Sequence, residues 1–198
     1  MGTMVCSNAQ NHPGGGAGLR PRKSESVSTS PQHDDGANVI RGRSVIVQPG
    51  EGPSFWQPTP ANGHADPVLT PANTGFEGMS LGYQTIAPGG HVREHSHTTQ
   101  VEMLICFRGR GHLVVDGVRH QLVPGTAGFF GYDVKQEIWN DGAEDLVMVW
   151  IIAPPGLENF FATIGRWRRP GEPAPAPFER RHDVVDIERA MGMNDTRA

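Results

Sequence analysis

The sequence predicts an all-β domain, either an antiparallel sandwich or a barrel. From residue 38 onward, short apolar runs of strand length recur, and each is bounded by turn residues. Asp116-Gly117 separates two of these runs and is a typical two-residue hairpin turn. Helical periodicity occurs only near the C-terminus. Together these observations favour an antiparallel fold with few helices.

The expected strands share a high content of β-branched, aromatic or other apolar residues between turn signals. In chain order they are residues 39–40, 44–47, 79–86, 101–108, 112–116, 118–123, 127–131, 136–140 and 146–153. The sequence contains no internal repeat, which favours one barrel domain over two.

Two short helices are expected after the strands. Residues 184–191 form the second, and the first, residues 155–166, has an apolar face made of Leu157, Phe160, Phe161 and Ile164. Between them, residues 169–178 are rich in proline and are expected to form an extended connector. The apolar helix face either closes the barrel or contacts another subunit, and the sequence leaves both alternatives open.

The composition predicts that part of the chain is not packed. The 198 residues include 26 Gly and 17 Pro, a share close to the low-complexity range. Residues 1–36 carry too few large apolar side chains to offset the entropy of ordering them, so they are expected to be a disordered tail. Residues 37–198 then form one domain of the usual length, with a core at 79–153 and a C-terminal helical extension at 154–198.

Charge and cysteine content exclude several classes of protein. A net charge of −4 provides no positive field for nucleic acid or anionic membranes, and no apolar run approaches the roughly 18 residues of a membrane span. The expected partner is a small molecule or another protein. Cys6 and Cys106 are too few for a disulfide framework, and no secretory signal is evident, so a cytoplasmic location is expected.

The residues with the clearest chemistry lie in the stretch 89–109. His95 and His97 are two apart on an expected extended segment, so their side chains share one face. Glu102 begins an apolar strand, where a carboxylate is costly to bury unless it is paired or bound to a cation. Two imidazoles and one carboxylate form the set that suits Fe(II) and related divalent metals. A His-x-His pair alone is common on protein surfaces, so the pair by itself is weak evidence.

The complete spacing is more specific than the pair. Gly89, His95, His97, Glu102 and Gly109 resemble the first motif of the cupin superfamily at every defining position. The resemblance implies a double-stranded β-helix, or jelly roll, with a metal held inside the barrel by His95, His97 and Glu102.

A second cupin motif is expected after a short connection, and residues 117–140 resemble it. Pro124-Gly125 matches the turn that opens the returning strands, and Asn140 matches the closing residue. Gln136 stands where the family has a third histidine. A glutamine ligates through its neutral amide oxygen, so Gln136 is either a weak fourth ligand or a residue that orients a bound water or substrate.

The resemblance implies an apolar cavity for a small organic molecule. We expect Tyr83, Cys106 and Trp150 to contact this substrate, although strand aromatics and a free cysteine are more often core residues. Glu102 and Gln136 are the expected catalytic residues. One divalent metal ion is expected, Fe(II) first, with Mn, Ni, Zn or Cu as alternatives.

Three classes of function remain open for such a cupin. The first is a non-haem dioxygenase acting on an anionic enolic or phenolic substrate, which the positive charge of the metal favours. The second is redox-neutral chemistry, as in cupin polyketide cyclases, isomerases or decarboxylases, with the metal as Lewis acid. The third is a binding protein without turnover. A homodimer is expected, because jelly-roll sheets commonly bury exposed edges against another subunit.

Overall fold

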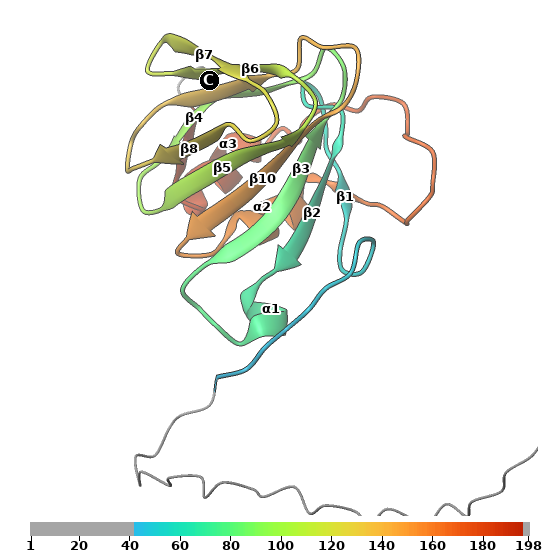
Figure 1. The fold of residues 1–198 in the computed structure, drawn as a ribbon, viewed down its shortest axis with the longest axis vertical. Coiled ribbons are helices and arrows are strands. Elements are labelled where there is room, and N and C mark those ends of the chain that lie inside the picture. The colour runs from blue at the N-terminus through green and yellow to red at the C-terminus, as the bar shows by residue number, and fades with distance from the viewer. Residues whose placement is uncertain (1–41, 196–198) are drawn as a thin grey trace, which may run out of the picture. The chain divides into compact units, whose positions relative to one another are not determined.

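Two antiparallel sheets make up most of the computed structural model, which describes residues 42–195 (Figure 1). The predicted tail and the expected strand at 39–40 lie outside the described residues. In the seven-stranded sheet the spatial order is β11 (Arg166–Trp167), β1 (Phe55–Trp56), β2 (His64–Leu69), β3 (Ser80–Ile86), β10 (Leu146–Ala153), β5 (Val101–Arg108) and β8 (Ala127–Phe130).

The five-stranded sheet carries most of the second expected motif. Its order is β12 (Met193–Asp195), β4 (His91–His97), β9 (Gln136–Trp139), β6 (Gly111–Val115) and β7 (Val118–Leu122). The chain passes from this sheet to the other in the short connection between β4 and β5. The fold class predicted from the sequence, a two-sheet jelly roll with short helices, is therefore confirmed.

Several strand predictions are confirmed closely. β5 and β10 have the predicted bounds. β3, β7, β8 and β9 differ from the prediction by one residue at one end, and β6 is shifted by one residue at both ends. The Asp116-Gly117 turn joins β6 to β7, and both residues have positive φ, at 45° and 82°. This is the backbone that a type I′ hairpin turn requires, and it explains the glycine.

Other expectations were wrong. Residues 44–47 form no strand, because no described strand pairs with them and Ile46 is 80% exposed. The prediction also missed β1, β2, β11, β12 and the one-turn helix α1 (Pro71–Thr74). β2 was missed because it contains Pro67, which cannot donate to a ladder; the register between β2 and β3 shifts just after it.

The two expected helices are present as α2 (Leu157–Ile164) and α3 (Val184–Ala190), which lie behind the seven-stranded sheet in Figure 1. The four apolar residues of α2 are all buried, and Phe161 contacts the fully buried Trp150 with ring centroids 5.9 Å apart. The apolar face of α2 therefore joins the core of its own chain, which decides between the two alternatives that the sequence left open.

Candidate metal centre

A β-bulge in β4 sets which of its side chains face the interior. In the pairing of β4 with β9, Val92 lies opposite Ile138, whereas His95 lies opposite Gln136. β4 thus advances three residues while β9 advances two, so one extra residue is inserted. In a regular strand, residues 92 and 95 would face opposite sides. Because of the inserted residue, Val92 packs against the core and His95 and His97 also turn inward.

The connection between the sheets is held by backbone and side-chain hydrogen bonds. The amide of Thr98 donates to the carbonyl of Gly192 at 2.8 Å, and the amide of Asp133 donates to the carbonyl of His97 at 2.8 Å. The buried Gln100 donates through Nε2 to the carbonyl of Pro154 at 3.0 Å. These bonds fix the ends of β4 and β5, so His97 and Glu102 face each other across the connection.

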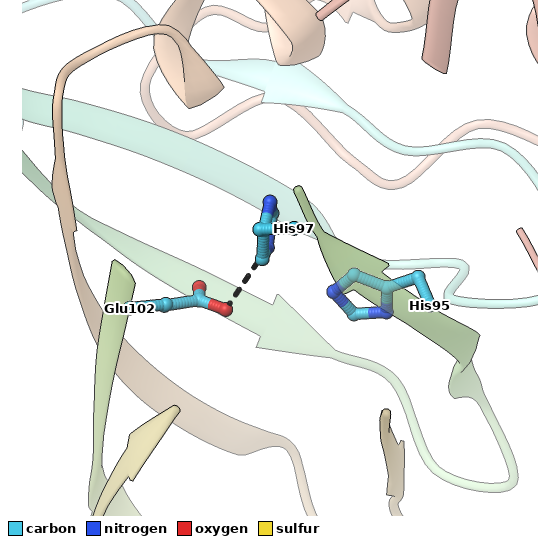
Figure 2. A group of neighbouring side chains, drawn as sticks. All are labelled: His95, His97 and Glu102. Carbon is cyan, nitrogen blue, oxygen red and sulfur yellow. Dashed lines mark ion pairs between the residues drawn. The ribbon is translucent and has the colours of Figure 1, made fainter. Parts of the chain in front are cut away.

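The two histidines and Glu102 converge as Figure 2 shows, two from β4 and one from β5. One ligand atom from each lies within 4.8 Å of the other two. His97 Nε2 is 3.3 Å from Glu102 Oε2, and the His95 and His97 rings are nearly perpendicular. The three residues could therefore hold one metal ion.

Buried polar atoms in this group fit a bound cation. His97 is 2% exposed, yet neither Nδ1 nor Nε2 has a hydrogen-bond partner among the described residues. A buried polar group without a partner costs about 1–3 kcal/mol. A metal ion accepts a lone pair from one such nitrogen, so it would account for one of the two atoms beside the buried carboxylate.

His95 is prepared as a neutral ligand. Its Nδ1 lies 2.9 Å from the backbone carbonyl of Arg93, so Nδ1 carries the proton and Nε2 keeps its lone pair. Burial lowers the pKa of His95, and the neighbouring His97 lowers it further, against an opposing effect of Glu102. The lowered pKa favours the uncharged imidazole that binds metals, whereas the hydrogen bond to the Arg93 carbonyl fixes the tautomer and by itself raises the pKa.

Gln136 lies beside this group, fully buried, at the start of β9. Its Nε2 donates a hydrogen bond to Glu102 Oε2, and its Oε1 has no partner among the described residues. The amide group therefore contacts the carboxylate directly, while its oxygen stays available. Whether Gln136 is a ligand or orients Glu102 stays a prediction.

A cavity that is partly open to solvent adjoins the candidate ligands. His95 and Glu102 line it, while His97 and Gln136 are buried and are not part of its lining. Most of the remaining wall is apolar and comes from both sheets and from α2, including Leu104, Ile138, Leu157 and Phe160. The cavity can accept a small organic molecule next to the candidate ligands.

The three residues expected to bind substrate do not line this cavity. Cys106 and Trp150 are fully buried in the core, and Tyr83 packs edge-on to Phe107 with ring centroids 5.6 Å apart. Tyr83 alternates with Gln84 along β3, and it is Gln84 that reaches the cavity. The cavity therefore gives no support to a substrate contact by these three.

Charged side chains of the cavity were missed at the sequence level. Arg93, Arg180 and Glu188 line it; Arg93 Nη2 is 3.9 Å from Glu188 Oε2, and Arg180 pairs with Glu188 Oε1. Burial lowers the pKa of Arg93, as does the neighbouring Arg180. Arg93 is two residues before His95, so the two-residue period of a strand could have predicted that it shares the face of His95. No sequence pattern near Arg180 or Glu188 predicts that they reach the cavity.

From the sequence alone, His91 and Glu94 are predicted to be solvated side chains of a loop that flanks the first motif, and this prediction is wrong. Both belong to β4 and line the cavity. The ring of His91 stacks on Trp139 with centroids 3.9 Å apart. The error arose because the strand begins earlier than the His95–His97 segment alone indicates.

Fold and site together define a jelly-roll protein with a buried 2-His-1-carboxylate group beside an apolar cavity. A family model described as the cupin domain matches residues 82–152, which include all four candidate ligands. This part of the chain is therefore a cupin domain.

Three solved structures with a similar fold share little sequence identity with this chain. A predicted oxalate decarboxylase from Thermotoga maritima is 19% identical, with 56% of this chain and 99% of that chain covered and a TM-score of 0.48. KdgF from Halomonas sp. is 12% identical, with coverage of 48% and 82% and a TM-score of 0.44. A sugar phosphate isomerase from Silicibacter pomeroyi is 20% identical, with coverage of 45% and 59% and a TM-score of 0.41.

No curated protein matches the sequence. Among the described residues, no helix has the length and apolar character needed to span a membrane.

Proposed function

We propose that the protein is a metal-dependent enzyme that acts on a small anionic organic molecule, with dioxygenase chemistry at Fe(II) as the leading assignment. The observation that carries the proposal is the buried group of His95, His97 and Glu102 beside the cavity. A 2-His-1-carboxylate set with open positions is typical of non-haem Fe(II) oxygenases.

A bound divalent ion would supply a Lewis acid that stabilises an enolate or phenolate, and as Fe(II) would also exchange electrons with dioxygen. The chain's own residues position the ligands. The carbonyl of Arg93 orients the His95 ring, and Gln136 Nε2 holds one oxygen of Glu102. The apolar wall excludes water around the substrate. A dioxygenase adds both oxygen atoms to the substrate, which supplies all the electrons, so no further reductant is needed.

The charges around the cavity favour an anionic substrate. Arg93 and Arg180 supply two positive charges to the lining, and Glu94, Glu102 and Glu188 supply three negative ones. A divalent ion then makes the balance of these groups positive. The negative charge of an enolate, phenolate or carboxylate would be stabilised by both the metal ion and an arginine side chain.

Oxygen consumption separates the proposed activity from its alternative. Iron-loaded protein is expected to consume oxygen in proportion to the loss of a phenolic or enolic substrate, and His97→Ala protein is not. Turnover that persists without oxygen would contradict the dioxygenase assignment and favour a redox-neutral isomerase, cyclase or decarboxylase. Bound metal and ligand with no turnover under either condition would identify a binding protein.

A further inference from the structure

Two buried glutamines interrupt the apolar wall of the cavity. Gln57 follows β1 and Gln84 belongs to β3; they are 5% and 8% exposed, and both line the cavity. An amide side chain is costly to bury unless its hydrogen bonds are made, and it carries two N–H donors and an oxygen with two acceptor sites. The partners of these two amides therefore indicate which of their atoms are left to meet a ligand.

The hydrogen bonds of the pair fix the orientation of both amide groups. Gln57 Nε2 donates to the backbone carbonyl of Thr85 at 3.0 Å. A carbonyl only accepts, so the Gln57 amide cannot be turned around, and its Oε1 must face Gln84 as an acceptor. Gln84 Nε2 donates to that oxygen at 2.7 Å. The remaining polar atom of Gln84 is Oε1, and no described residue donates a hydrogen bond to it.

A purely structural role accounts for Gln57 but not for Gln84. Gln57 ties the segment after β1 to β3, because it reaches the Thr85 carbonyl. Gln84 already belongs to β3 and precedes Thr85, so its bond to Gln57 joins no further element. A few polar groups in a mostly apolar cavity usually orient the bound molecule. An amide oxygen can only accept, so the ligand group that suits Gln84 is a donor, such as a hydroxyl or an amino group.

Strand register places Gln84 at a distance from the candidate metal ligands. Glu102 lies opposite Ile152 of β10, and Gln84 lies opposite Met148 of the same strand. The two residues are therefore two strands and four residues apart, which corresponds to about 16 Å between their Cα atoms. Leu104 belongs to the row between them and lines the cavity. The cavity thus offers a candidate metal site, an apolar stretch and a remote hydrogen-bond acceptor.

We propose that Gln84 is a substrate-binding residue whose amide oxygen accepts a hydrogen bond from a hydroxyl or amino group at the end of the substrate remote from the metal. This inference rests on the proposed function for the other end, where the metal takes an acidic oxygen. It narrows the substrate class to elongated molecules with an enolic, phenolic or carboxylic oxygen at one end, an apolar middle and a neutral hydrogen-bond donor at the other.

Three two-ring phenols test the proposal: para-phenylphenol and its derivatives with a hydroxyl or a methoxy group at the remote para position. Calorimetric titration of the iron-loaded, full-length protein without oxygen measures their dissociation constants. The dihydroxy compound should bind about tenfold more tightly than para-phenylphenol, because only its remote group donates to Gln84 Oε1. The methoxy compound accepts but cannot donate, so it should bind no more tightly than para-phenylphenol.

Gln84→Leu should lose the preference for the dihydroxy compound and keep its metal content. Gln121→Leu is the matched control, because Gln121 is exposed on β7 of the other sheet, and it should keep the wild-type preference. If Gln84→Leu does not fold, the order of the three compounds in the wild type still decides.

The possible failures separate this inference from the proposed function. Equal affinities of the wild type for all three compounds, or a preference that survives in Gln84→Leu, would overturn the role of Gln84 and leave the proposed function standing. Iron-loaded wild type that binds none of the three would contradict the phenolic substrate class, and this inference with it.

Discussion

The two ends of β9 hold buried amide side chains with opposite hydrogen bonding. Asn140, directly after the strand, donates through Nδ2 to the carbonyls of Ile86 and Glu144, both at 2.8 Å, and accepts at Oδ1 from the amide of Gly142. Gln136, at the other end, donates to Glu102 and leaves Oε1 without a partner among the described residues. Both side chains are at most 1% exposed.

The difference separates a structural residue from a candidate functional one. A buried amide with all its bonds made ties backbone segments together, and at Asn140 it joins β3 to the turn after β9. A buried amide with an unmet acceptor, beside a histidine with two unmet nitrogens, lowers the stability of the protein alone and indicates a missing binding partner. Of these two equally buried amides, the one with an unmet hydrogen-bond acceptor is therefore the one that lies beside the candidate ligands.

The strongest test of this contrast removes a candidate ligand. His97→Ala should weaken divalent-metal binding by more than about 100-fold, because even indirect contacts to a metal contribute 10- to 100-fold. The metal-free variant should still unfold cooperatively, at a somewhat lower denaturant concentration than the metal-free wild type, because the buried ring and its 3.3 Å contact with Glu102 Oε2 are lost. Metal titration and urea unfolding measure the two effects.

His112→Ala is the control for that variant, because His112 pairs with Asp141 at 2.9 Å and not with the candidate ligands. It should bind metal as the wild type does. Equal metal content in wild type and His97→Ala would show that the site lies elsewhere.

Added metal should stabilise the wild type. A ligand at 100 times its dissociation constant that binds only the folded state adds about 2.7 kcal/mol, which raises the melting temperature of a chain of this size by several degrees. Thermal unfolding with and without Fe(II), under anaerobic conditions, measures the shift. The shift should disappear in His97→Ala, and its persistence there would separate stabilisation from the candidate site.

Asn140→Ala should destabilise the protein without affecting the metal. The substitution leaves two carbonyls and one amide short of their partner, and we expect a loss of about 2 kcal/mol in the free energy of unfolding. Urea unfolding measures that loss, and metal analysis should find the same content as in the wild type. Loss of metal with unchanged stability would contradict the structural role assigned to Asn140.

Gln136→His should have the smallest effect of the four. If the Gln136 amide oxygen reaches the ion, imidazole in its place should tighten metal binding by up to about tenfold, because imidazole is the better ligand for these metals. Metal titration measures the change. An unchanged affinity would leave Gln136 with the role of holding Glu102.

Local patterns predicted much of the fold and of the candidate site. The apolar runs at β5 and β10 gave the strand bounds, and the positive φ values of Asp116 and Gly117 follow from the turn type that the dipeptide favours. The shared face of His95 and His97 followed from the two-residue period of an extended chain. The same period does not say which side of the sheet Tyr83 faces. In the structure Tyr83 faces away from the cavity and packs against Phe107.

The sequence by itself determined features that depend on neighbours along the chain: strand period, hairpin turn, helix face and the spacing of the candidate ligands. The tertiary structure decided that the bulge in β4 turns His95 and His97 inward, and that Arg180 and Glu188 reach the same cavity. It also aligned the apolar residues of β3, β10, β5 and β8 into one surface. Steric preferences act over two to four residues, whereas strand register and the contacts between distant segments depend on how the whole core packs.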